Sequence, residues 1–108
     1  MLFFVKAELR ERPNLPREQW LGMTASTWEV IKQLEGSGKV LAGGAFVGRR
    51  AGCVIADVDS NEDLAELLNR LPVFAYLEWE VVPMIPADRA LDGAKWALQQ
   101  LSLAQARN

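Results

Sequence analysis

The amino-acid sequence predicts a single α+β domain with the order β-α-β-β-α-β, followed by one further helix. Two observations lead to this fold class: four short apolar segments are typical of strands, and two longer segments between them repeat apolar residues every three or four positions. The length of 108 residues suits one domain, and a composition of 50% apolar and 24% charged residues is that of an ordinary globular protein.

The first half of the chain is expected to form a strand, a helix and a second strand. Residues 2–9 alternate and present one wholly apolar face to a core. Pro16 suits the first turn of a helix over 16–35, because that turn leaves its N–H groups unbonded in any case. In the second strand, 39–47, Gly43-Gly44 predicts a bulge or a close backbone approach.

The second half repeats this plan and adds a tail. A third strand is expected over 53–58, and Ser60 then caps a second helix. The fourth strand is expected over 75–82, where Pro83 breaks the alternating pattern. A tail helix over about 87–106 follows, with a leucine and alanine stripe along it.

Right-handed crossovers join these elements into a four-stranded antiparallel sheet with two helices on one face, the ferredoxin-like plan. This gives a domain over 1–86 and a helical tail over 87–108. The second sheet face is expected to carry four apolar residues among its charges: Leu2, Phe4, Tyr76 and Val82. The simplest cover for such a face is a second copy, sheet against sheet, as in a dimeric α+β barrel. The tail helix is a second candidate for packing between copies.

Charge and missing residue types exclude several classes of function. The net charge is −2, so neither a nucleic acid nor an anionic membrane is an expected partner. The sequence has no histidine and one cysteine, which removes Ser-His and Cys-His catalysis, histidine-bound zinc and an intrachain disulfide. We therefore expect no metal and no cofactor. No apolar run reaches the roughly 20 residues of a membrane helix, and no signal-peptide pattern follows Met1, so a cytoplasmic location is the default expectation.

Carboxylates on the second sheet face are the candidate proton-transfer groups. Glu8, Glu78 and Glu80 would point to the same side, with Lys6 near them if the first and fourth strands are neighbours. A partner copy that buried one of these carboxylates would raise its pKa and make it a usable base. The alternative is a set of cross-strand ion pairs at the seam between two copies.

The ligand-binding candidates fall in two places. Arg49 and Arg50 at a hairpin tip could hold a carboxylate with their planar guanidinium groups, or they could be solvated turn surface. Aromatic side chains would line one space between helix and sheet, either as core packing or as a small-molecule pocket: Trp20, Trp28, Phe46 and Trp79. Cys53 is expected to be a small buried residue rather than a nucleophile.

Three stretches of the chain resemble one known family. They are the opening residues 1–6, the spaced group Gly48, Asp57, Val58, Ser60 and Leu64, and residues 71–76 (Leu-Pro-Val-Phe-Ala-Tyr) with Glu80, Val81 and Pro83. Together they resemble the muconolactone Δ-isomerase family over roughly residues 1–85.

This resemblance implies a ferredoxin-like subunit that assembles through its sheet, often into rings. It also implies cofactor-free isomerisation of a lactone that carries a carboxylate, in the bacterial breakdown of aromatic compounds. In such a reaction a base removes a proton beside a carbonyl, an acid returns one elsewhere, and a cation holds the substrate carboxylate.

The chain departs from the family pattern in three places, which keeps three functions open. The isomerases typically have a histidine where Phe4 stands, a Trp/Arg/His-rich run where this chain has residues 40–46, and a second proline in the loop that here reads Val73-Phe74-Ala75. The first hypothesis is an isomerase with Glu8, Glu78 or Glu80 as the base and Lys6 or Arg49 as the anion holder, its substrate walls including Trp28, Phe46 and Trp79. The second is a non-catalytic binding or assembly protein for a small apolar organic anion. The third is a cofactor-free monooxygenase or cyclase of the same barrel superfamily.

Overall fold

The computed structural model describes residues 1–11 and 13–106, so the last two residues of the expected tail, 107–108, lie outside the described part. The elements, in chain order, are β1 (Leu2–Leu9), α1 (Arg17–Gly36), β2 (Val40–Ala45), β3 (Ala51–Asp57), α2 (Asn61–Asn69), a 3₁₀ turn (Phe74–Tyr76), β4 (Leu77–Met84) and α3 (Ala87–Ala106).

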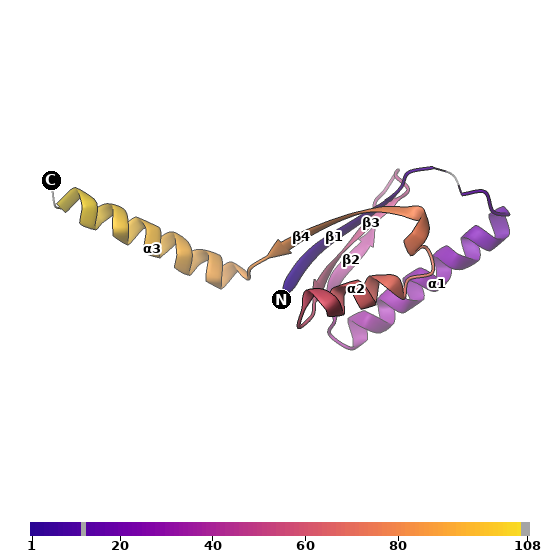
Figure 1. Ribbon diagram of the computed structural model, residues 1–108, viewed down its shortest axis with the longest axis horizontal. Helices are drawn as coiled ribbons and strands as arrows, with labels where there is room; N and C mark the ends of the chain where they lie inside the picture. The colour runs from indigo at the N-terminus through magenta and orange to yellow at the C-terminus, as the bar shows by residue number, and fades with distance from the viewer. Residues whose placement is uncertain (12, 107–108) are drawn as a thin grey trace.

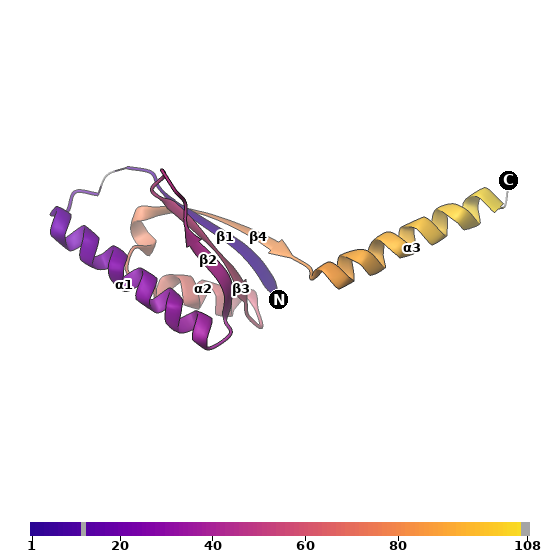
Figure 2. The ribbon, with the colours of Figure 1, turned by 180° about the vertical axis from the view of Figure 1, so that it is seen from behind.

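The four strands form one antiparallel sheet in the order β2-β3-β1-β4, with α1 and α2 on the same side of it (Figures 1 and 2). The register pairs Val5 with Val54 on one neighbour and with Val81 on the other. This confirms the predicted ferredoxin-like α+β fold. It also confirms that β1 and β4 are neighbours, the condition on which the carboxylate prediction depended.

The hydrophobic core lies between the sheet and the two helices. Strand alternation turns Phe3 and Val5 toward the helices, and both are almost fully buried. The helix α2 buries three leucines of its apolar stripe: Leu64, Leu67 and Leu68. The predicted cap begins that helix, because the amide of Asp63 donates a 3.1 Å hydrogen bond to the Ser60 hydroxyl.

The predicted limits of the fourth strand, 75–82, are wrong by two residues at each end. β4 continues through Pro83, which pairs with Phe3. A proline is tolerated here because β4 is an edge strand and its outer side needs no N–H donor. Residues 74–76 form a 3₁₀ turn instead, so Tyr76 is not on the open sheet face and contacts Trp20 edge-to-face at 5.8 Å between ring centroids.

The predicted second and third strands, 39–47 and 53–58, also have different limits in the structure. β2 ends at Ala45, because a turn with Gly48 at φ 80° follows, and β3 begins at Ala51. Of the two features predicted for Gly43-Gly44, the bulge is not there, because the register shifts earlier, between Val40 and Ala42. The close backbone approach is at Gly43, where a Cβ atom would lie 2.7 Å from the carbonyl oxygen of Cys53.

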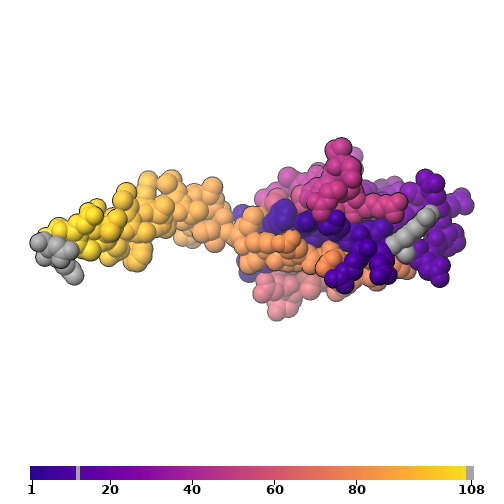
Figure 3. Space-filling model, turned by 90° about the horizontal axis from the view of Figure 1, so that it is seen from above, coloured from indigo at the N-terminus to yellow at the C-terminus, as the bar shows by residue number. Residues whose placement is uncertain are grey.

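The helix α3 extends away from the domain as a separate arm (Figures 1 and 3). Its 20 residues continue the direction of β4 after a short link at Ile85 and Pro86, and none of them is buried. The arm gives the molecule its length, with principal extents of 70 × 28 × 24 Å. Among the described residues, none of the helices is long and apolar enough to span a bilayer.

Candidate functional site

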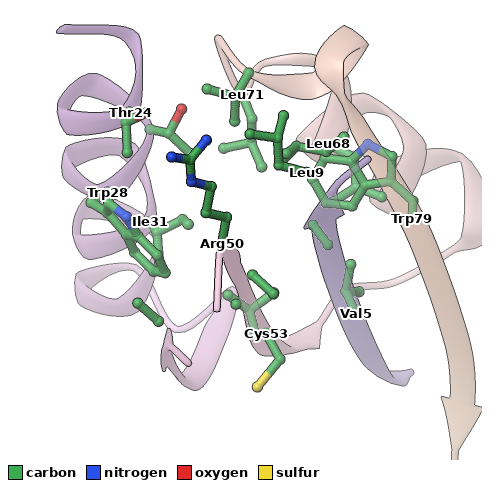
Figure 4. A pocket seen from close by; sticks show the side chains of 18 of the residues that line it. Val5, Leu9, Thr24, Trp28, Ile31, Arg50, Cys53, Leu68, Leu71 and Trp79 are labelled. Carbon is green, nitrogen blue, oxygen red and sulfur yellow. The ribbon is translucent and has the colours of Figure 1, made fainter. Parts of the chain in front are cut away.

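A cavity of about 600 Å³ lies between α1 and the sheet (Figure 4). Its walls are large apolar side chains from α1, from α2 and the residues directly after it, and from β4, including Trp20, Trp28, Ile31, Leu68, Leu71 and Trp79. The floor is provided by small residues of three strands: Ala7, Ala45, Ala51 and Gly52. Large walls over a small floor leave room for a flat organic molecule against the sheet.

The absence of a side chain at Gly52 lets Trp28 pack directly against the backbone of the sheet. A Cβ atom at Gly52 would lie 2.9 Å from the carbonyl oxygen of Gly44 and 3.1 Å from the Cη2 atom of Trp28. The side chain of Trp28 therefore rests against the backbone of β3 and closes one side of the cavity. The Trp79 ring is fixed on the other side, because its Nε1 donates a 3.0 Å hydrogen bond to the carbonyl of Phe74 and its ring stacks on Phe74.

The polar groups of the cavity are mainly cations. Arg17, Arg49 and Arg50 contribute to the lining, and Figure 4 shows the Arg50 side chain extending into the space between α1 and the sheet. The hydroxyls of Thr24 and Thr27 donate to backbone carbonyls within α1, at 3.0 and 2.9 Å. Within the described residues, no carboxylate lines the cavity. An apolar chamber with guanidinium groups suits a small organic anion.

The predicted aromatic set is brought together in part. Trp20, Trp28 and Trp79 all line the cavity, as the sequence pattern indicated. Phe46 does not contribute to the lining, because β2 ends at Ala45 and Phe46 enters the turn that follows. There its ring lies under the guanidinium of Arg49, 5.7 Å from centroid to Cζ.

The predicted carboxylates lie on the opposite face of the sheet from the cavity. In the β1–β4 register Glu8 pairs with Glu78 and Lys6 pairs with Glu80, and these even-numbered positions face away from the helices. Glu78 accepts two hydrogen bonds from Arg10, at 2.8 and 3.2 Å. The sequence therefore placed all three carboxylates on one face, but that face is not the one with the cavity.

Arg49 connects the two faces at the end of the sheet. Its Nη2 donates to both carboxylate oxygens of Glu8, at 2.7 and 2.8 Å, while the same residue lines the cavity. Lys6 adds a longer ion pair to Glu8 at 3.8 Å. The hydrogen bond from Arg49 lowers the pKa of Glu8 most; desolvation opposes it, and the positive charges of Arg49 and Lys6 lower the pKa further.

The positions of Cys53 and Arg17 relative to the cavity follow from the fold, and no sequence motif indicated them. The register pairs Cys53 with Lys6 on the open face, and Figure 4 shows its sulfur pointing away from the middle of the cavity. Sequence reasoning missed Arg17 because its position in the first turn of α1 says nothing about the hairpin that faces it. A search for cations at helix starts beside a glycine-rich strand could have found it.

Comparison with known proteins identifies the family. A family model described as muconolactone delta-isomerase matches residues 1–88. The chain belongs to the muconolactone delta-isomerase family. A member from Acinetobacter lwoffii, muconolactone Delta-isomerase 1, is 33% identical over 84 residues, which are 78% of this chain and 88% of that protein. The muconolactone Delta-isomerase of Cupriavidus pinatubonensis is 31% identical over 84 residues, covering 78% of this chain and 91% of its own length.

Solved structures agree with this family assignment. A crystal structure of muconolactone isomerase superimposes with a TM-score of 0.72 at 27% identity, over 80% of this chain and 90% of that one. A 5-chloro-2-hydroxyhydroquinone dehydrochlorinase from Burkholderia phenoliruptrix, in complex with 2,5-dihydroxybenzoquinone, gives a TM-score of 0.63 at 15% identity, over 82% and 98%. At that identity the dehydrochlorinase shows a shared fold only. The family match ends at residue 88, so α3 lies almost wholly outside it.

Proposed function

We propose that this chain isomerises a small lactone bearing a carboxylate, by moving a double bond without a cofactor, in the breakdown of aromatic compounds. One observation carries the proposal: in a chain of the muconolactone delta-isomerase family, an apolar cavity of about 600 Å³ is lined by Arg17, Arg49 and Arg50. The apolar walls suit the ring carbons of a lactone, and the guanidinium groups suit its carboxylate.

Arg49 is the anion holder in this proposal, and Trp28 and Trp79 are the walls that hold the ring. Both tryptophans line the cavity, and the indole of Trp79 is fixed by its hydrogen bond to Phe74. Fixed walls support catalysis because a positioned substrate loses less freedom on the way to the transition state.

Glu8 is the base in this proposal, because it is the predicted carboxylate whose hydrogen-bond partner lines the cavity. While Arg49 holds Glu8, the carboxylate is a weak base with a lowered pKa. A substrate carboxylate that draws Arg49 to itself would free Glu8 and let its pKa rise. This requires the lactone to lie at the Arg49 end of the cavity, because Glu8 faces away from the rest of it. There Glu8 takes an acidic proton from one end of the allylic system conjugated with the lactone carbonyl, and the resulting acid returns it at the other end, so that the composition of the molecule is unchanged.

A second copy of the chain is the proposed partner on the open sheet face. The register places Ile55, Phe4 and Val82 in one apolar row across three strands, and Val82 is 40% exposed. A row of this kind is normally covered, and an identical row on a second copy gives a self-complementary contact. The proposed assembly therefore joins two sheets face to face.

Non-catalytic binding of the same class of anion is the second candidate. It is favoured by the lining itself, which within the described residues contains no aspartate, glutamate, lysine or tyrosine. If Glu8 does not reach the bound molecule, the cavity holds an organic anion without a base. Binding and turnover therefore have to be measured separately.

The deciding experiment follows the ultraviolet absorbance of muconolactone with purified protein, and the tryptophan fluorescence in parallel as a measure of binding. We expect turnover above the buffer rate in the wild-type protein, loss of turnover with retained binding in Glu8→Gln, and wild-type behaviour in Arg70→Ala. Arg70 is a matched control because it forms an exposed 2.8 Å ion pair on α2, with Glu66. Binding without turnover in the wild-type protein would contradict the proposed isomerase activity and support non-catalytic binding.

A further inference from the structure

The arm formed by α3 has no partner in its own domain. Every one of its residues from 87 to 106 is exposed, including Leu91 at 53%, Leu98 at 65% and Leu101 at 56%. In proteins most helix stability comes from packing an apolar face rather than from propensity, and Gly93 inside this helix weakens it. Packing its apolar residues against another surface would therefore stabilise it.

Four apolar residues of α3 follow the spacing of a two-helix seam, whereas the exposed Trp96 and Leu103 lie on the opposite side of the helix. Leu91, Ala94, Leu98 and Leu101 recur at alternating intervals of three and four, which is the seven-residue pattern of paired helices. The positions beside this seam are small, so that a second backbone could approach closely: Ala90, Ala97 and Ala104. The charged residues of the arm, Asp88, Arg89, Asp92 and Lys95, sum to zero (2 − 2), so two such arms do not repel each other through net charge.

Surfaces on the domain itself fit the arm poorly. The arm leads away from its own sheet after Ile85 and Pro86, as Figures 1 and 2 show from opposite sides. The open sheet face of another copy is apolar along only part of its length, since the rows of Lys6 with Glu80 and Glu8 with Glu78 occupy the rest. The arm is about 30 Å long at 1.5 Å per residue, longer than that apolar part.

We propose that α3 pairs with α3 of a second copy as an antiparallel two-helix contact centred on position 96. In this arrangement Leu91 lies opposite Leu101 of the other copy, and Ala94 lies opposite Leu98. The small alanine receives the large leucine, and the twofold symmetry repeats the same fit on the other side of the centre. The contact extends the assembly beyond the part of the chain that the family shares, and it does not depend on the proposed catalytic activity.

Disulfide trapping tests this pairing directly. Full-length chains carrying Cys53→Ser are made with either Ala94→Cys or Leu98→Cys, and they are oxidised alone and as an equal mixture. We expect the mixture to form covalent dimers about tenfold faster than either variant alone, because a disulfide needs Cβ atoms within about 3.5–4.5 Å. Dimers formed equally well by each single variant would overturn the antiparallel order, and absence of dimers in every sample would overturn the pairing.

A pair of neighbouring substitutions provides an independent measurement. Leu98→Asp places a charge in the seam, whereas Gln99→Asp places the same charge outside the seam, on the side of α3 that carries Trp96 and Leu103. Sedimentation analysis should show that the dissociation constant of the assembly rises about tenfold or more for Leu98→Asp and stays at the wild-type value for Gln99→Asp. Equal dissociation constants for the two variants would contradict the proposal.

Discussion

At the scale of single residues, Arg49 is the link between the cavity and the carboxylates. It lines the cavity on one side of the sheet and holds both oxygens of Glu8 on the other. The pair is partly solvated, with side chains 51% and 39% exposed, so it contributes little to stability as an ion pair. The pair matters because the guanidinium group of Arg49 can bind either Glu8 or an anion in the cavity.

Loss of Arg49 should weaken anion binding. A hydrogen bond to a charged group contributes about 1.5–3 kcal/mol, so Arg49→Ala should raise the dissociation constant of an aromatic carboxylate roughly 10- to 100-fold. Quenching of tryptophan fluorescence can follow the titration, since Trp28 and Trp79 line the cavity. The Arg70→Ala control should bind as the wild-type protein does, and equal binding by Arg49→Ala would remove the assigned role.

Glu8 should make stability depend on pH in one direction. Its pKa is lowered in the folded protein, so the unfolded chain binds the proton first as the pH falls. The stabilisation is therefore complete above the unfolded pKa of about 4.3 and is lost as the pH falls through the folded pKa. In urea unfolding, Glu8→Gln should therefore be less stable than the wild-type protein at pH 7. The difference should shrink as the pH falls through the folded pKa, and a difference that is constant down to acid pH would contradict this assignment.

At the scale of elements, β2 shows how two adjacent glycines can have different roles. A Cβ atom at Gly43 would lie 2.7 Å from the carbonyl oxygen of Cys53 and 2.8 Å from a methyl carbon of Val54. A Cβ atom at Gly44 would meet nothing within 4 Å. Gly43 therefore has no room for a side chain against β3, whereas Gly44 has room for one.

The two alanine substitutions should separate these roles. Gly43→Ala should destabilise the protein by about 1–3 kcal/mol, because the clash is with backbone that cannot move away. Gly44→Ala should change stability by less than about 1 kcal/mol, toward greater stability, because alanine loses less chain entropy on folding. Chemical denaturation of both variants tests this, and similar stabilities for the two would show that β2 can shift its register.

The order and type of the elements could be predicted because each depends on local pattern. The helix cap at Ser60 and the buried leucine stripe of α2 were both predicted from nearby residues and are both present. The limits of β4 were not predicted, because they depend on its position at the edge of the assembled sheet. Alternation correctly put Glu8, Glu78 and Glu80 on one face and the tryptophans elsewhere. The sequence could not decide whether the space between helix and sheet is packed core or a cavity, because that depends on how far α1 stands from the sheet.

At the scale of the whole molecule, we have proposed two contact surfaces for other copies of the chain: the apolar row on the open sheet face and the seam of α3. The row lies within the region shared with the family, whereas the arm lies almost wholly beyond it. Fold and family were recognisable from the sequence, because both depend on residues close together in the chain. The direction of the arm was not, since it depends on the link at Ile85 and Pro86.

The sheet-face contact can be tested with one pair of variants. Val82→Lys should raise the dissociation constant of the assembly about a hundredfold, because it would bury an unpaired charge between the sheets. Val47→Lys is the matched control, as Val47 is fully exposed in the turn after β2. Light scattering over a range of protein concentrations gives the mass of each variant, and unchanged assembly in Val82→Lys would contradict the proposed contact.

The most direct test of the account is a crystal structure of the protein with bound muconolactone. The account predicts electron density in the cavity between α1 and the sheet, with the ring between Trp28 and Trp79 and the carboxylate within hydrogen-bond distance of Arg49. Density for the ligand on the open sheet face, or an empty cavity at a saturating concentration of the lactone, would contradict it.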